Sequence, residues 1–181
     1  MEKEQTYLEG CFLITPKVFS DERGNFFESF NKSQFYQLTD LDVDFVQDNQ
    51  STSHRGVLRG LHFQTGNYQQ AKLVRVIKGS VLDVVVDIRP QSKTFGQHFS
   101  TVLSAENCKQ LFIPKGFAHG FVVLEDDSIF AYKCDEYYHK ASEGGIIYND
   151  ETLNIDWQFP ESELIISEKD KVLPSFRSLF K

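Results

Sequence analysis

The sequence is poor in cysteine, and the three cysteines that it has argue against a disulfide framework. Cys11, Cys108 and Cys134 are odd in number and widely separated among 181 residues. Disulfide-rich secreted domains carry an even, closely spaced set, and zinc sites carry short repeated spacings. The cysteines therefore indicate reduced thiols. We expect a cytoplasmic protein in which none of them acts as a nucleophile.

Long apolar runs and an excess of positive charge are also lacking. The longest apolar stretches, such as residues 82–88, have only the length of a strand and are interrupted by Asp83 and Asp87. The N-terminus is charged from its second residue, so we expect neither a membrane span nor a secretion signal. A net charge of -7 without a stripe of lysine or arginine would repel phosphate backbones, so nucleic-acid binding is not expected.

Residues typical of β-strands are abundant, and phenylalanine occurs 17 times. Turn signals separate the short runs of valine, isoleucine and phenylalanine at residues 22–25, 78–80, 114–116 and 142–145. No helical period is sustained, and no repeat or linker divides the chain. The sequence predicts an all-β protein with a single domain over residues 1–181. The polar segment 159–176 is predicted to form a short helix and a covering tail.

The clearest predicted strand pair is residues 72–89, where Lys78-Gly79 separates two β-rich runs. A two-residue hairpin turn would place Lys72 opposite Val85 and diagonal to Asp83 on one face. The residues of the other face would be Leu73, Leu82, Val84, Val86 and Ile88. The charged face is either ordinary solvated surface or the mouth of a small β-barrel, where ligands commonly bind.

The segment RGVLRGLHFQ, residues 55–64, places a lone histidine between apolar side chains. On a strand, His62 and Gln64 share one face and point away from the apolar residues beside them. A lone histidine is more often structural than catalytic. The nearby Arg59 favours function, because a guanidinium beside an imidazole indicates a bound anion rather than core packing.

The segment IPKGFAHGF, residues 113–121, contains a Pro-x-Gly-x-x-His pattern that ends at His119. This pattern resembles the second motif of the cupin superfamily, a jelly-roll β-barrel. In metal-binding cupins the histidine joins an HxH pair and a glutamate, but Gln64 stands where the second histidine of the pair would be. The other histidines, without ligand spacing, are His54, His98 and His139. We therefore predict no metal site.

Seven segments extend the resemblance over nearly the whole chain. They are DERGNFFESF (21–30), VQDNQSTS (46–53), GVLRGLHFQ (56–64), QAKLVRVIKGSVLDVVVDIR (70–89), FIPKGFAHGF (112–121), YKCDEYY (132–138) and SEKD (167–170). In this order they resemble the dTDP-4-dehydrorhamnose 3,5-epimerase family. The chain departs from the family at residues 65–70, where proline is usual, and at Phe63, where tyrosine is common. The resemblance implies a cupin-type jelly-roll β-barrel with a few short peripheral helices, acting as a homodimer.

The resemblance also implies the substrate, a dTDP-linked 4-keto-6-deoxyhexose, and the absence of a cofactor. The C4 ketone of such a sugar acidifies the hydrogens on C3 and C5. Epimerisation then needs a base, a group that stabilises the enolate oxygen, and an acid on the opposite face of the ring. The product would be dTDP-4-dehydro-L-rhamnose, an intermediate in rhamnose synthesis for polysaccharide.

Each of these roles falls on a matching residue of this sequence. By the resemblance, His62 is the base, and Asp170 pairs with it to orient the ring. Lys72 stabilises the enolate oxygen with support from Asp83, and Tyr132 returns the proton from the opposite face.

The residues that the resemblance assigns to substrate binding are Gln47, Asn49, Arg59, His119, Arg23, Phe26 and Glu28. Gln47, Asn49 and Arg59 would contact the sugar or the diphosphate, and His119 would support the base or a phosphate. Arg23, Phe26 and Glu28 would recognise the nucleotide in the site of a neighbouring subunit.

Three other functions stay open on the sequence. A relative that inverts only one carbon of another dTDP-4-keto-deoxysugar is the nearest, and Tyr132 favours double inversion without settling it. A non-catalytic jelly roll that binds sugar nucleotides is opposed by the retained acid, base and lysine. A metal-dependent cupin oxygenase is opposed by the missing HxH pair.

Overall fold

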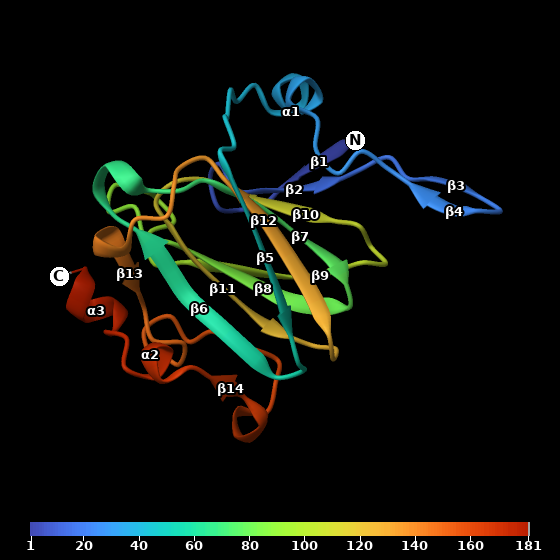
Figure 1. Cartoon of the computed structure of the whole chain (residues 1–181). Coiled ribbons are helices and arrows are strands. Elements are labelled where there is room, and N and C mark those ends of the chain that lie inside the picture. Colours follow the sequence, from blue (N-terminus) through green and yellow to red (C-terminus); the bar gives the residue numbers. More distant parts are fainter. Residues whose placement is uncertain (181) are drawn as a thin grey trace.

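Two mainly antiparallel sheets form the body of the molecule in this computed structural model, which describes residues 1–180 (Figure 1). The strands of the first sheet, in spatial order, are β1 (Glu2–Gln5), β2 (Phe12–Thr15), β10 (Gln110–Ile113), β7 (Lys72–Lys78), β12 (Ser128–Cys134) and β5 (Gln47–Ser53). Those of the second are β13 (Glu143–Gly145), β6 (Val57–Gln64), β11 (Phe117–Val123), β8 (Ser80–Asp87) and β9 (His98–Ser104), with β14 (Ile165–Ile166) parallel to β6. The chain crosses repeatedly between the sheets, which confirms the predicted all-β jelly roll.

The remaining elements are short. The helices are α1 (Lys32–Thr39), α2 (Glu168–Lys171) and α3 (Phe176–Leu179), and the 3-10 turns are η1 (Gly66–Tyr68), η2 (Lys140–Ser142) and η3 (Glu161–Glu163). A separate hairpin of β3 (Phe19–Asp21) and β4 (Gly24–Phe26) projects from the body on one side (Figure 1). The predicted short helix and tail at the C-terminus are confirmed by α2 and α3. No helix within residues 1–180 has the length and apolarity to cross a membrane.

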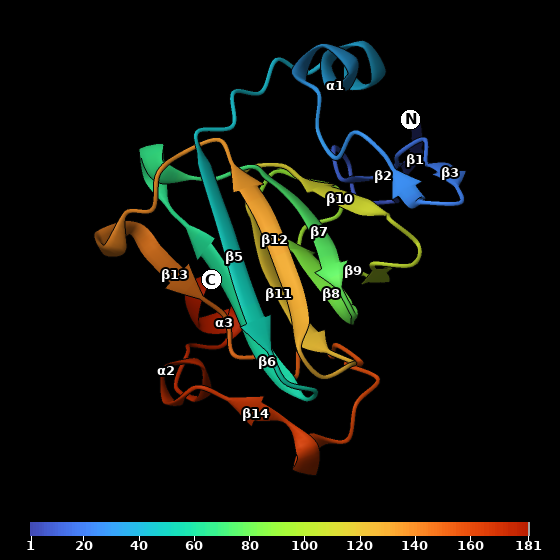
Figure 2. The ribbon, with the colours of Figure 1, turned by 45° about the vertical axis from the view of Figure 1, so that its right-hand side comes forward.

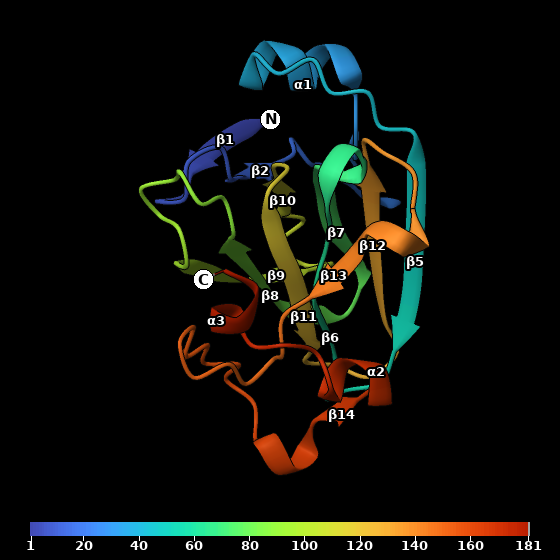
Figure 3. The ribbon, with the colours of Figure 1, turned by 90° about the vertical axis from the view of Figure 1, so that its left-hand side faces the viewer.

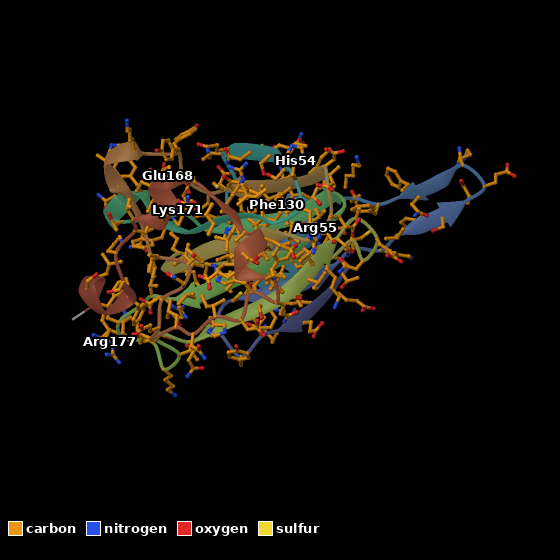
Figure 4. All side chains as sticks on the ribbon, turned by 90° about the horizontal axis from the view of Figure 1, so that it is seen from below. His54, Arg55, Phe130, Glu168, Lys171 and Arg177 are labelled. Carbon is orange, nitrogen blue, oxygen red and sulfur yellow. The ribbon has the colours of Figure 1, made fainter. Side chains whose placement is uncertain are left out.

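The main core lies between the two sheets. Alternate residues of each strand point inward, so Val74 and Val76 of β7 join Val81 and Val85 of β8 in one buried cluster. Phe130 of β12 belongs to the same cluster and lies near the centre of the molecule in Figure 4. Because the apolar cluster fills most of this interior, the polar residues that also point inward are confined to one end.

The outer faces of the sheets are covered by segments from the two ends of the chain. On the second sheet, outward residues such as Leu82 and Val84 pack against Trp157 and Phe176 of the C-terminal segment. On the first sheet, Phe35 of α1 packs in the cluster that covers part of the outer face. Figure 3 shows α2, α3 and β14 gathered beside the second sheet. The C-terminal segment is thereby brought next to β6.

The predicted hairpin over residues 72–89 is wrong, because β7 and β8 lie in different sheets. β7 pairs with β10 and β12, whereas β8 pairs with β9 and β11. The chain turns a corner at Gly79, whose φ of +76° favours glycine. A tight turn between two β-rich runs does not distinguish a hairpin from a corner between sheets. The predicted cross-strand contact between Lys72 and Val85 therefore does not form.

Asp87, at the end of β8, fixes the loop that follows. Its buried carboxylate accepts hydrogen bonds from Arg89 Nε at 2.9 Å, Ser92 Oγ at 2.5 Å and Thr94 Oγ1 at 2.7 Å. Burial by itself would raise the pKa of Asp87, but these donors outweigh it and lower the pKa from 3.8 to about 2. The ionised carboxylate therefore stabilises the folded state.

Replacing Asp87 by asparagine is expected to lower the free energy of unfolding at pH 7 by about 2 kcal/mol. Because the pKa is lower in the folded state, this stabilisation is present above pH 3.8 and is lost as the pH falls toward about 2. Urea unfolding between pH 7 and pH 3 measures the difference, with Glu106→Gln as an exposed control. A difference that does not shrink with falling pH would contradict this account.

Candidate active site

A cavity of about 690 Å³ opens at one end of the space between the sheets. Its walls come from β5, β6, β7, β11 and β12 and from the C-terminal segment around β14 and α2. The predicted site residues that line it are Gln47, Asn49, Arg59, His62, Lys72, His119, Tyr132 and Asp170. The structure therefore brings eight residues from six separate segments of the sequence into one pocket.

Arg59 and His62 lie on the same side of β6 because the strand carries a bulge. On a regular strand, residues three apart point to opposite faces. Here Arg59 pairs with Phe121 and His62 pairs with His119, so three steps along β6 match two along β11. Gly60 makes this possible, since its φ is +126° and an added Cβ would lie 2.8 Å from the carbonyl oxygen of His119. The bulge turns both the guanidinium and the imidazole toward the cavity.

A buried carboxylate holds His62. Its Nε2 lies 2.7 Å from Oδ1 of Asp170, and the Ser167 hydroxyl that caps α2 accepts the Asp170 N–H. Figure 2 shows α2 beside β6. Burial opposes ionisation of Asp170, but the hydrogen bond and charge of His62 and the Gly60 N–H outweigh it, and the pKa of Asp170 is lowered. An ionised Asp170 orients the imidazole with Nε2 as donor and leaves Nδ1 free to accept a proton.

Lys72 and Tyr132 enter the cavity from the first sheet, whereas His62 enters from the second. Nζ of Lys72 lies 5.9 Å from the centroid of the Tyr132 ring. Burial lowers the pKa of Lys72, against the opposing charge of Asp83, and burial raises the pKa of Tyr132. The pair therefore offers an ammonium that readily shares its proton and a phenol that keeps its proton at neutral pH.

Asp83 contacts His119 rather than Lys72, which corrects the predicted placement. Its Oδ2 lies 2.9 Å from Nε2 of His119, and both side chains are buried. Burial lowers the pKa of His119 in spite of Asp83, so a neutral ring donates Nε2–H to the carboxylate. Within residues 1–180, Oδ1 of Asp83 has no hydrogen-bond partner. Asp83 thus orients His119 directly and acts on Lys72 only through its charge.

Among the polar residues of the cavity wall that were not predicted, three contact one another: Tyr138, Glu143 and Lys169. The Tyr138 hydroxyl donates to Glu143 Oε2 at 3.0 Å, and Lys169 Nζ lies 2.6 Å from Glu143 Oε1. The hydrogen bond and charge of Lys169 lower the pKa of Glu143. Tyr138 and Lys169 fall inside two of the segments that carry the family resemblance, so their position was a usable signal. Glu143 had no such signal, because only the pairing of β13 with β6 brings it to the cavity.

Comparison with known proteins identifies the family. The family model described as dTDP-4-dehydrorhamnose 3,5-epimerase matches residues 5–178. The chain belongs to this family. A curated relative, the dTDP-4-dehydrorhamnose 3,5-epimerase of Escherichia coli strain K12, is 51% identical over 177 residues, which cover 98% of this chain and 95% of the relative.

Solved structures of the epimerase family share this fold. The dTDP-6-deoxy-D-glucose-3,5-epimerase of Legionella pneumophila, in complex with dTDP-4-keto-L-rhamnose, superposes with a TM-score of 0.93 at 47% identity, covering 97% of this chain and 93% of that one. A 3′-monoepimerase of Streptomyces bikiniensis, in complex with dTDP-quinovose, gives a TM-score of 0.88 at 33% identity, covering 97% and 87%. Fold alone therefore does not separate double from single epimerases.

The predicted nucleotide-recognition residues of this epimerase-family chain lie away from its own cavity. Arg23 and Phe26 are on the β3–β4 hairpin, where the Arg23 side chain is 85% exposed and pairs with Asp21. Glu28 accepts hydrogen bonds from Asn31 and Gln34. Figure 4 shows the hairpin projecting from the end of the molecule opposite α2, on which Glu168 and Lys171 are labelled. Their role in the site of a neighbouring subunit stays a prediction.

Each of the two imidazoles of the cavity is hydrogen-bonded to a carboxylate. His62 contacts Asp170 and His119 contacts Asp83. Residues 1–180 hold no group of three or more histidine, cysteine, aspartate or glutamate side chains placed to bind a metal ion.

Proposed function

We propose that the protein is an isomerase that inverts C3 and C5 of dTDP-4-dehydro-6-deoxy-D-glucose to give dTDP-4-dehydro-L-rhamnose, in a single catalytic domain. The observation that carries the proposal is the placement of a carboxylate-held imidazole on one sheet and a protonated phenol on the other, with an ammonium beside the phenol. A sugar ring between the sheets would meet a base on one face and an acid on the opposite face.

In the first step, Nδ1 of His62 removes the proton from a carbon next to the ketone. Asp170 stabilises the imidazolium that forms, because its carboxylate lies 2.7 Å from Nε2 and is shielded from water. The base and its carboxylate come from β6 and α2, so the pair depends on the docking of the C-terminal segment.

The enolate oxygen that forms at C4 needs a positive or hydrogen-bonding group. Lys72 lies beside Tyr132 in the cavity wall and can supply this positive charge. Burial lowers the pKa of Lys72, so its ammonium is a stronger acid than that of an exposed lysine. Tyr132 then delivers a proton to the opposite face of the ring. Because burial raises the pKa of Tyr132, the phenol is in its protonated form when the enolate forms.

The remaining wall residues suit the nucleotide part of the substrate. Arg59 is a cation for the diphosphate, and Gln47 and Asn49 supply amide groups. The Tyr138 ring, on a residue that is 55% exposed, offers an aromatic surface on which a planar base can stack.

We further propose that two copies of the chain form a homodimer in the cytoplasm. The projecting β3–β4 hairpin exposes Arg23 and Phe26 away from the body, as a segment that reaches a second copy would. Phe26 is 68% exposed and its partner across the hairpin, Phe19, is 54% exposed, so the hairpin presents two phenylalanines that a second copy would cover. Free Cys11, Cys108 and Cys134 accord with a reducing compartment.

Removal of metal ions is expected to leave the activity unchanged. The ketone of the substrate is itself the electron sink, and Lys72 supplies the positive charge that a metal would otherwise provide. Initial rates before and after exhaustive chelation measure this. Loss of activity that Fe²⁺, Mn²⁺ or Zn²⁺ restores would contradict it.

The function is tested by incubating the protein with dTDP-4-dehydro-6-deoxy-D-glucose and determining the configuration of the product by NMR. The L-configured 4-keto sugar is the expected product. Inversion at one carbon would replace the proposal with the second candidate, an epimerase that acts on a single carbon. The similarity of the fold to that of a 3′-monoepimerase supports this candidate. Tight binding without any conversion would instead indicate a non-catalytic binding protein.

A further inference from the structure

Gln64, the last residue of β6, joins two loops at the mouth of the cavity. Its side-chain Nε2 donates to the carbonyl oxygens of Tyr68 at 2.7 Å and Tyr137 at 3.2 Å. Its Oε1 accepts the N–H of His139 at 2.7 Å. Although the cavity reaches this residue, Gln64 is only 7% exposed. All the bonds of the carboxamide therefore go to the backbone of these loops.

The loop segment Tyr137, Tyr138 and His139, here called the strap, is held from both sheets. Gln47 of β5, in the first sheet, accepts the Tyr138 N–H at 2.9 Å, while Gln64 of β6 belongs to the second sheet. The strap is part of the connection from β12 to β13, so it crosses between the sheets, and its Tyr138 forms part of the cavity wall.

The strap also contacts the loop at residues 65–70, which follows β6. The rings of Tyr68 and His139 stack with centroids 3.8 Å apart and an interplanar angle of 6°. Gln64 bonds to both of these residues, so the stack and the carboxamide act on the same two loops. The position of the strap is therefore coupled to residues 65–70.

We propose that Gln64 is a positioning residue that fixes the strap and, through it, the Tyr138 ring on the cavity wall, and thereby sets the affinity for the nucleotide. The inference rests on the proposed function for its nucleotide part. A carboxamide is the side chain that offers both donors and an acceptor without charge, as two carbonyls and one N–H require. Loss of the Gln64 carboxamide frees the backbone groups that it binds in the two loops, and water can then solvate these groups. The strap therefore loosens while the sheets stay folded.

The first test is hydrogen exchange in the ligand-free protein. In Gln64→Met, which preserves length and apolar volume, the His139 amide is expected to exchange on the order of 10-fold faster than in the wild type. Gln110→Met is the matched control, because this buried glutamine also donates to a backbone carbonyl, that of Ser29, but lies outside the cavity. It should leave the His139 amide unchanged.

The second test separates binding from chemistry. Gln64→Met is expected to raise the Kd for dTDP and the KM for the sugar nucleotide roughly 10-fold, with kcat within about twofold of the wild type. Tyr68→Ala should have a smaller effect in the same direction. The loss of binding free energy in the double variant, from its Kd for dTDP, should be smaller than the sum of the losses in the two single variants. Both changes release the same strap.

Unchanged exchange at His139 would overturn the positioning role. Faster exchange with unchanged Kd and KM would overturn the link to affinity, and a fall in kcat at constant KM would move Gln64 to the reacting centre. Additive effects of Gln64→Met and Tyr68→Ala would also contradict a shared strap. A wild-type protein that does not bind dTDP would overturn the proposed function and the affinity link, whereas the exchange result would still decide the positioning role.

Discussion

Replacing His62 by asparagine is expected to lower the rate of epimerisation by roughly 10²-fold or more, and to abolish proton exchange at both C3 and C5. Asparagine has no basic nitrogen, so neither proton can leave the sugar. The effect covers both carbons, because the proposed mechanism uses the imidazole held by Asp170 as the base for each.

The matched control for this change is His54→Asn. The His54 side chain is 77% exposed and lies outside the cavity, and it is labelled on the surface in Figure 4. Thermal unfolding must accompany the kinetics, because His62→Asn also removes the imidazole from buried Asp170. Retention of more than a tenth of the rate by His62→Asn, with His54→Asn at full activity, would assign the base to another residue.

Replacing Tyr132 by phenylalanine is expected to separate proton exchange from inversion. Phenylalanine removes only the hydroxyl and keeps the ring, which packs against the main core cluster. His62 can still remove a proton and return one on its own side. Solvent deuterium should therefore enter recovered substrate, while the yield of inverted product falls by roughly 10²-fold.

Tyr36→Phe, on the exposed side of α1, is the control for the loss of a phenol elsewhere. NMR of substrate recovered from deuterated water reports the exchange, and the product signals report the inversion. If Tyr132→Phe binds substrate but shows no exchange at all, Tyr132 takes part in forming the enolate and the division of roles is wrong.

On the regular strand β8, alternation in the sequence was sufficient to predict which face each residue occupies. Alternation placed Leu82 and Val84 on the face opposite to that of Asp83. The structure confirms this, because the Leu82 and Val84 side chains belong to the cluster outside the second sheet. Alternation did not predict the partner strand, because Gly79 serves a corner between sheets as well as it serves a hairpin. The expected contact of Lys72 with Val85 failed for this reason.

The site itself depends on contacts that spacing does not encode. His62 and Asp170 are 108 positions apart, and only the family resemblance linked them before the structure brought α2 to β6. The bulge at Gly60 was likewise hidden, although a glycine within a strand is its usual signal. Glu143 reaches the cavity through the pairing of β13, a strand of three residues with two glycines and no apolar pattern.

The most direct measurement of the central claim is the position of solvent deuterium after turnover. The protein is incubated with dTDP-4-dehydro-6-deoxy-D-glucose in deuterated water, and the label is located by NMR. The account predicts deuterium at both C3 and C5 of an inverted product, because one ketone acidifies both carbons and His62 and Tyr132 approach the ring from opposite sheets. Label at only one carbon, or at neither with substrate bound, would contradict it.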